Sequence, residues 1–185
     1  MSVRVSFNLD DADLEHLAAI AQQTQLRARS EPAEAIIAGA REVLESANRA
    51  QLADFVKERY SWLETMLQMV EDPLWGLSSE DRLRTLNALA CFGSSATAAP
   101  ASGMLDHAIM IELVSRDLHH DLEAYRDFCK LRDSYDRKHA TPDADRERWL
   151  QERCASLQER MHKRRRKDLD GAGSGLRKLL SLFGL

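Results

Sequence analysis

Residues that interrupt helices are scarce in this chain of 185 residues, which contains 8 glycines and 4 prolines. Alanine, leucine, glutamate and arginine are abundant by contrast, and these residues lose little rotamer freedom in a helix. Hydrophobic residues make up 44% of the chain and charged residues 30%, as in folded globular proteins. The length suits one domain that buries its own core. The composition therefore predicts a single, mostly helical domain.

Cysteine is also scarce. The three cysteines, Cys91, Cys129 and Cys154, include no C-x-x-C pair, and their number is odd. Both facts argue against a disulfide framework and against a zinc knuckle. We expect three reduced and buried thiols.

The sequence has no long apolar run. About 20 apolar residues are needed to cross a bilayer, and the longest candidate, residues 104–114, is interrupted by Asp106, His107 and Glu112. The first residues lack the apolar run of a signal peptide. With a formal net charge of -4, the chain has no global positive field to attract nucleic acid or acidic lipid. We expect a soluble cytoplasmic protein whose anionic partners, if any, bind a local basic patch.

The N-terminal part of the sequence predicts one short strand and two helices. Polar and apolar residues alternate over residues 3–9, which is typical of a half-buried strand. Helical spacing then continues to about Gln25. Ser30 is a candidate N-cap for a second helix, and the apolar stripe of this helix continues without a strong break as far as Val70.

The middle of the sequence predicts two more helices. Ser78 and Asp81 resemble a capping box, which opens a helix that ends near Gly93. Residues 93–103 are small and typical of a loop. The pattern from Leu105 to about Lys138 is the longest helical stretch in the chain.

A charged helix and a tail follow. Thr141 and Pro142 are typical of a helix start, and the basic run Lys163–Lys167 is predicted to end this helix. Residues 170–175 have the composition of a flexible linker. Apolar residues then recur at i, i+3, i+4 and i+7, as in a short amphipathic helix; they are Leu176, Leu179, Leu180 and Phe183.

The predicted fold class is therefore all-α. We expect a bundle of five to six helices with one short N-terminal β-strand over residues 1–168. Residues 169–185 are expected to form a Gly-rich linker and a short amphipathic tail.

One segment resembles a known family. Residues 103–129 run from Gly-Met-Leu-Asp-His-Ala through Arg-Asp-Leu-His-His-Asp to Asp-Phe-Cys. Together with the preceding loop from residue 93, this segment resembles the motif of the bacterial YkvA-like domain family. The matching residues are Pro100, Gly103, Leu105, Asp106 and Ala108.

The departures from the family motif lie in its acidic positions. The Pro-Asp pair of the motif falls on Ala96 and Thr97, and its second aspartate is His107. The resemblance covers most of residues 5–130 and implies a helical domain. It implies no reaction, because the family has no established activity.

Acidic and histidine side chains on the long helical stretch are candidate metal ligands. Asp117 and His120 have the spacing of half a carboxylate-bridged metal site, and Glu112, His119 and Glu123 lie nearby. A metal site needs three or four converging ligands. The spacing also fits two i,i+4 pairs on an exposed helix face, Glu112 with Arg116 and His119 with Glu123. A metal-dependent activity centred on Glu112, Asp117 and His120 is one alternative function.

No arrangement of catalytic residues emerges from the sequence. The chain contains no G-x-S-x-G elbow and no P-loop. It also lacks a G-x-G-x-x-G fingerprint between a predicted strand and a predicted helix. We expect neither catalysis nor a cofactor.

A DNA-binding regulator is the other alternative. A strand followed by two helices resembles the order of a ribbon-helix-helix protein, in which paired strands read the major groove. Arg4 is the single cation of that strand, and Asp10, Asp11 and Asp13 follow it. This is a poor surface for phosphate contact, and we expect no nucleic acid partner.

The basic run is the strongest local charge feature. Lys163, Arg164, Arg165, Arg166 and Lys167 precede the tail, and a basic cluster beside an amphipathic helix suits an acidic groove on another protein or, more weakly, an anionic membrane. The alternative without a function is a solvated last helical turn whose cations interact favourably with the helix dipole. We predict a non-catalytic interaction or adaptor protein, and the oligomeric state stays open.

Overall fold

The computed structural model describes residues 19, 24, 26–92, 101–138 and 144–171, and all the regular secondary structure within them is helical. The elements are α2 (Ala33–Arg49), α3 (Asp54–Glu71), α4 (Ser79–Leu89), the short 3-10 helix η1 (Ala90–Phe92), α5 (Ala101–Asp117), α6 (His119–Lys138) and α7 (Ala144–Gly171). The all-α prediction is confirmed. The predicted number of five to six helices is too low, since the described residues already form six α-helices and one 3-10 helix. The predicted strand at 3–9 lies outside them.

The helix that precedes α2 ends later in the chain than predicted. Residues 26–30 are still helical, and the Ser30 hydroxyl donates a hydrogen bond back to the Leu26 carbonyl at 2.8 Å. Ser30 is therefore the last residue of that helix and not the N-cap of α2. Pro32 is the N-cap instead, and it makes no side-chain capping bond.

The apolar stripe predicted to run on to Val70 belongs to two helices. Ala50 and Ala53 have extended backbone, which ends α2 and precedes α3. The two helices pack against each other. A single helix of this length would leave most of its apolar stripe without a partner, so folding back lets both halves bury their apolar faces.

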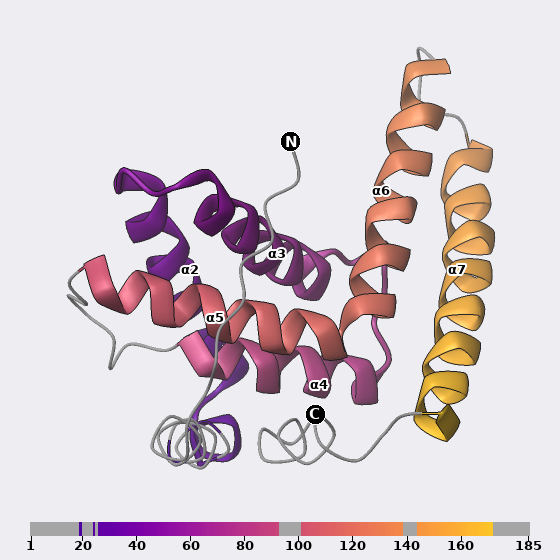
Figure 1. Cartoon of the computed structure of the whole chain (residues 1–185). Coiled ribbons are helices and arrows are strands. Elements are labelled where there is room, and N and C mark those ends of the chain that lie inside the picture. Colours follow the sequence, from indigo (N-terminus) through magenta and orange to yellow (C-terminus); the bar gives the residue numbers. More distant parts are fainter. Residues whose placement is uncertain (1–18, 20–23, 25, 93–100, 139–143, 172–185) are drawn as a thin grey trace.

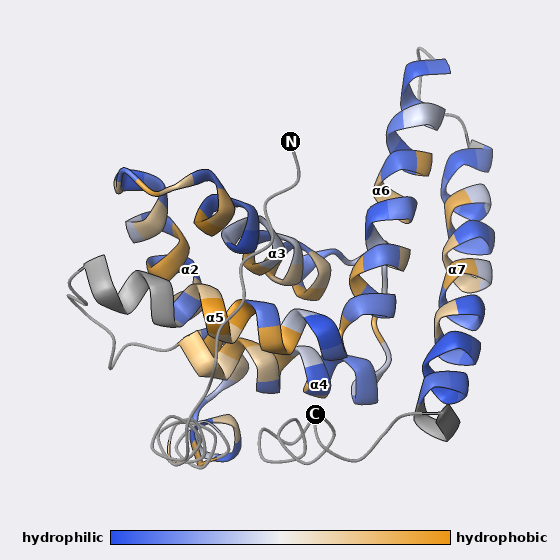
Figure 2. Ribbon diagram, viewed as in Figure 1, coloured by the Kyte–Doolittle hydropathy of each residue, from blue (hydrophilic) through white to orange (hydrophobic). Residues whose placement is uncertain are grey.

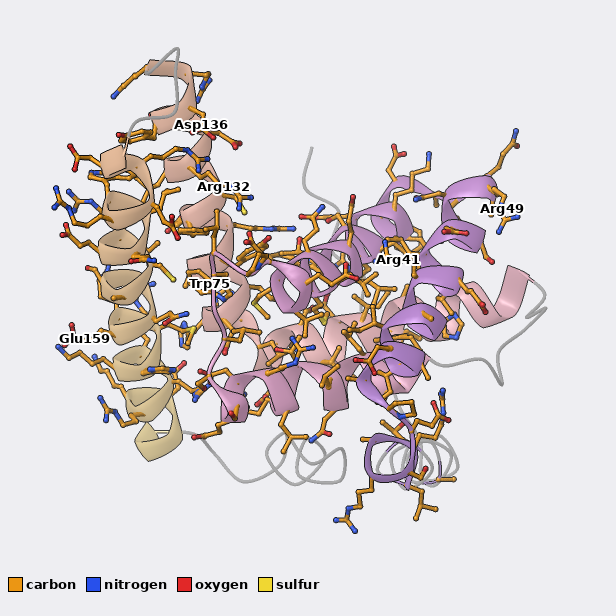
Figure 3. All side chains as sticks on the ribbon, turned by 180° about the vertical axis from the view of Figure 1, so that it is seen from behind. Arg41, Arg49, Trp75, Arg132, Asp136 and Glu159 are labelled. Atoms are coloured by element: carbon orange, nitrogen blue, oxygen red, sulfur yellow. The ribbon has the colours of Figure 1, made fainter. Side chains whose placement is uncertain are left out.

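A tight turn between α3 and α4 places the largest buried side chain. Asp72 ends α3, and its carboxylate accepts a hydrogen bond from the backbone N–H of Leu74 at 3.0 Å. Gly76 has φ of 55°, a left-handed conformation that favours glycine. Trp75, which lies between Asp72 and Gly76 in the turn, is fully buried. Figure 3 shows Trp75 where helices α6 and α7 meet the other helices. The predicted capping box follows: the backbone N–H of Asp81 donates to the Ser78 hydroxyl at 3.1 Å.

The predicted long helix from 105 to 138 is two helices that meet at Leu118. Figure 1 shows α5 and α6 running in clearly different directions. Leu118 is fully buried, and its N–H and carbonyl still bond to Val114 and Leu122. Neither glycine nor proline stands at this bend, so tertiary packing around Leu118 sets the change of direction.

Helices α6 and α7 lie side by side as an antiparallel hairpin (Figure 1). In Figure 2 the apolar colour on α7 is largely confined to the side that faces α6. The buried residues on α7 are spaced by four, three and four, as in coiled-coil seams; they are Leu150, Cys154, Leu157 and Met161. No helix among the described residues is long and apolar enough to cross a membrane.

Candidate functional site

The basic run does not end its helix, as the sequence predicted, but lies inside it. Helix α7 continues to Gly171, so Lys163–Lys167 occupies the turns before its end. Side-chain exposure shows which of these cations points inward. After steps of four, three and four the seam would next reach Arg164, but Arg164 is exposed and the Arg165 side chain is the shielded one, at 17% exposure. The run is split into one inward residue and four outward ones.

Arg165 forms the centre of a buried ion cluster. Its Nη1 lies 2.7 Å from Asp81 Oδ1 on α4 and 3.2 Å from Asp121 Oδ1 on α6. The Arg165 side chain is 17% exposed, and those of Asp81 and Asp121 are 4% and 1% exposed. Because both carboxylates are shielded from water, the guanidinium is needed to compensate their charge. Arg165, which the sequence placed in the docking surface, thus has two buried carboxylate partners within the fold.

Asp81 is held by three partners. The Ser78 hydroxyl donates to Asp81 Oδ2 at 2.7 Å, and His162 Nε2 of α7 lies 2.9 Å from the same oxygen. Burial alone would raise the pKa of the Asp81 carboxyl, but the hydrogen bonds from Ser78, His162 and Arg165 outweigh it and lower the pKa. The carboxylate is therefore ionised while it is buried.

Asp121 is in the opposite situation. Burial raises the pKa of its carboxyl, and the cations of Arg84 and Arg165 offset this effect only in part. Arg84 on α4 lies 3.6 Å from Asp121 and also pairs with Asp117 at the end of α5. The cluster thereby ties α4, α5 and α6 to α7.

The outward cations lie together on the second half of α7. We define the basic face as Arg160, Lys163, Arg164, Arg166 and Lys167, all of which are exposed. Lys163 pairs with Glu159 at 2.8 Å, and Arg164 lies 3.8 Å from Glu123 of α6. Both pairs are well exposed and screened by solvent, so they leave the face positive.

The three predicted metal ligands do not converge. Glu112 accepts hydrogen bonds from Arg59 and Arg116, Asp117 pairs with Arg84, and His120 pairs with Asp168. Each of the three side chains therefore has partners of its own. The helix break at Leu118 also separates His120 on α6 from Glu112 and Asp117 on α5.

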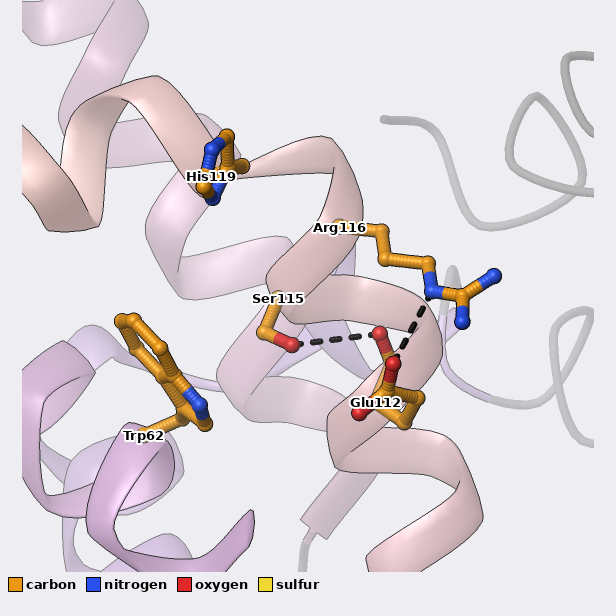
Figure 4. Close-up of a pocket in the computed structure, with 5 residues that line it drawn as sticks. All are labelled: Trp62, Glu112, Ser115, Arg116 and His119. Carbon is orange, nitrogen blue, oxygen red and sulfur yellow. Dashed lines mark hydrogen bonds and ion pairs between the residues drawn. The ribbon is translucent and has the colours of Figure 1, made fainter. Parts of the chain in front are cut away.

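A shallow hollow of about 360 Å³ lies between α3 and the α5–α6 junction (Figure 4). Its lining residues are Trp62, Glu112, Ser115, Arg116 and His119. The Arg126 guanidinium stacks on Trp62, 3.4 Å from the ring centre. The Ser115 hydroxyl donates to the Glu112 backbone carbonyl at 3.1 Å, so it is held by its own helix and is not activated by a base.

The residues of the family motif are only partly described. Gly103, Leu105 and Asp106 lie in α5, where residues 101–103 are helical rather than part of the predicted loop. Ala108 is buried. Pro100, the predicted helix start at Thr141, and the tail residues Leu176, Leu179, Leu180 and Phe183 lie outside the described residues.

Comparisons with models of protein families, with curated proteins and with solved structures found no match to this chain. The site is therefore interpreted from its own geometry.

Proposed function

We propose that this chain is a non-catalytic interaction protein that docks an acidic surface of another protein on the basic face of α7. The split of the basic run carries the proposal. The inward Arg165 already has two buried carboxylate partners. The residues of the basic face project outward, and the ion pairs of Lys163 and Arg164 are exposed and screened by solvent. A rigid helix that presents cations at fixed spacing suits electrostatic recognition of a partner.

An acidic protein fits this face better than a membrane. Binding to an anionic membrane combines cations with apolar side chains that enter the acyl boundary. The large apolar residues that are exposed among the described residues are Leu26, Phe55 and Leu83, and none of them is on α7. If the tail residues Leu176, Leu179, Leu180 and Phe183 form the amphipathic helix that their spacing predicts, they would add an apolar contact to the same partner.

The other interpretations from sequence have less support. The DNA-binding alternative depends on residues 3–9, which lie outside the described residues. The metal-dependent alternative depends on three ligands that have separate partners. Membership of the YkvA-like family stays a proposal that rests on the motif between residues 93 and 129.

The experiment compares charge-reversal variants of the full chain. The triple variant K163E/R164E/K167E reverses three cations of the basic face, and the control R49E/K57E reverses two exposed cations elsewhere, on α2 and α3. Tagged proteins are used to capture partners from an extract of the native host, together with a form that ends at Asp170. We expect an acidic protein to be captured by the wild type and by the control, less of it at high salt, and none by the triple variant. Equal capture by all forms would contradict the proposal.

A further inference from the structure

A second group of side chains near the α5–α6 junction has the chemistry of a metal site. Among the described residues, one ligand atom from each of His119, His120 and Glu123 lies within 4.8 Å of the other two. We propose that these three residues bind a divalent transition metal such as zinc. This inference does not depend on the proposed docking function.

The closest pair already has the separation that metal ligands show. His119 Nε2 lies 3.3 Å from Glu123 Oε1. Two ligands of a tetrahedral zinc, each about 2.0–2.1 Å from the ion, are separated by about 3.3 Å. The two residues are one helical turn apart on α6, so a small movement of either side chain would admit an ion between them.

His120 supplies the second observation. Its Nε2 is 2.7 Å from Asp168 Oδ2 of α7, whereas its Nδ1 is buried and has no hydrogen-bond partner. A buried ring nitrogen without a partner is unfavourable, and a bound ion would satisfy it. A carboxylate on the opposite nitrogen is the arrangement that orients a ligating histidine and raises its basicity. Asp168 is therefore assigned as the positioning residue for His120.

The surroundings leave room for binding. His119 lines the hollow of about 360 Å³ beside Trp62, as Figure 4 shows, and His119 and Glu123 are both exposed to solvent. Two imidazoles and one carboxylate leave a coordination position free for water or for a group of a bound molecule. Arg164 lies 3.8 Å from Glu123, and its positive charge opposes binding of a cation there. The effect is weak, because both side chains of this pair are exposed to solvent.

The test uses full-length, untagged protein and zinc chloride, with affinity measured by competition against a chromophoric chelator. We expect one zinc per chain. H119A/H120A should lose at least tenfold in affinity. D168N should lose about tenfold, as outer partners of ligating histidines do. R164Q removes the competing cation and should bind zinc several-fold more tightly than the wild type.

D127N removes an exposed carboxylate of α6 outside the group and serves as the matched control with unchanged affinity. Circular dichroism checks that each variant is folded. No zinc binding by the wild type, or the same affinity in H119A/H120A as in the wild type, would overturn the assignment. Unchanged affinity in D168N alone would overturn the role of Asp168.

Discussion

Asp81 shows how one residue can serve both its own helix and the tertiary structure. It accepts hydrogen bonds from Ser78, which caps α4, and from His162 and Arg165, which belong to α7. The local half of this role was predicted from the Ser78–Asp81 spacing. The long-range half was not, because no local pattern indicates a partner 84 residues away.

Substitution of Asp81 by asparagine should destabilise the fold by about 2–4 kcal/mol near neutral pH, since it leaves Arg165 without its closest partner. The pKa of Asp81 is lowered in the folded state. Its contribution is therefore fully present above the unfolded pKa and is lost as the pH falls through the folded pKa. Urea denaturation should show a difference between wild type and D81N that is constant above about pH 5 and shrinks below about pH 4.

D127N is the control for this measurement, because Asp127 is exposed on α6, where it pairs with the likewise exposed Lys130 at 3.2 Å. It should change stability by less than about 0.5 kcal/mol. A D81N variant as stable as the wild type at pH 7 would show that the ion cluster does not stabilise the fold.

The cysteines give a second prediction for individual residues. All three are free thiols, as expected from sequence, although Cys91 and Cys129 are half-buried rather than fully buried. Burial raises the pKa of Cys91 to about 12 and that of Cys154 to about 11. Because the thiolate is the reactive form, both should react with a disulfide reagent at pH 8 at least about 100-fold more slowly in the native protein than in urea. Fast reaction of all three thiols in the native protein would contradict the described burial.

At the scale of elements, sequence patterns located the apolar faces better than the ends of helices. The stripes predicted before and after residue 50, and before and after residue 118, are real, but each belongs to two helices. Ala50 and Leu118 carry no breaking signal, since alanine and leucine are strong helix formers. Packing between helices, which a single sequence does not reveal, decides both breaks.

The inward position of Arg165 was not predictable from the apolar spacing alone. Leu150, Cys154, Leu157 and Met161 are spaced by four, three and four, and the next step of three would place Arg164 inward. The partners of Arg165, Asp81 and Asp121, lie far away along the chain, so no local pattern indicates them. The five cations are adjacent in sequence, but position on the helix determines which of them face solvent.

Replacement of Arg165 by glutamine should loosen α7. It leaves two buried carboxylates, Asp81 and Asp121, close together without the cation between them. Hydrogen–deuterium exchange is expected to accelerate over the second half of α7, while the buried amides of α3 stay protected. The matched variant R160Q alters an exposed cation on the same helix and should leave exchange unchanged. Equal protection in R165Q and R160Q would contradict the anchoring role of the cluster.

At the scale of the whole molecule, the turn around Trp75 joins the hairpin to the remaining helices. The indole ring packs near Tyr125 and Phe128 of α6, with ring centres 5.6 and 5.3 Å apart. The Trp75 carbonyl accepts hydrogen bonds from Cys154 at 3.1 Å and from Gln158 at 2.7 Å, both on α7. One residue of the α3–α4 turn thus contacts both helices of the hairpin.

Substitution of Trp75 by alanine should therefore cost about 3–5 kcal/mol, because it opens a cavity where the two parts of the molecule meet. The loss should appear as a lower urea midpoint in a single transition, measured by circular dichroism. W62A, which truncates a half-buried indole at the rim of the hollow, should cost less. If W75A unfolds at the wild-type midpoint, the hairpin does not depend on this contact.

Charge is distributed unevenly over the whole chain. The formal net charge is -4, yet the second half of α7 presents a basic face. Attraction to an acidic partner must therefore come from this local face and should weaken as salt screens it.

The most direct test is the binding of a fluorescent oligoglutamate peptide, measured by anisotropy at low and moderate salt. The account predicts binding by the wild type and by the R49E/K57E control, weaker binding as salt increases, and at least tenfold weaker binding by K163E/R164E/K167E. The same affinity in the triple variant and in the control would contradict the claim that the basic face of α7 is the docking surface.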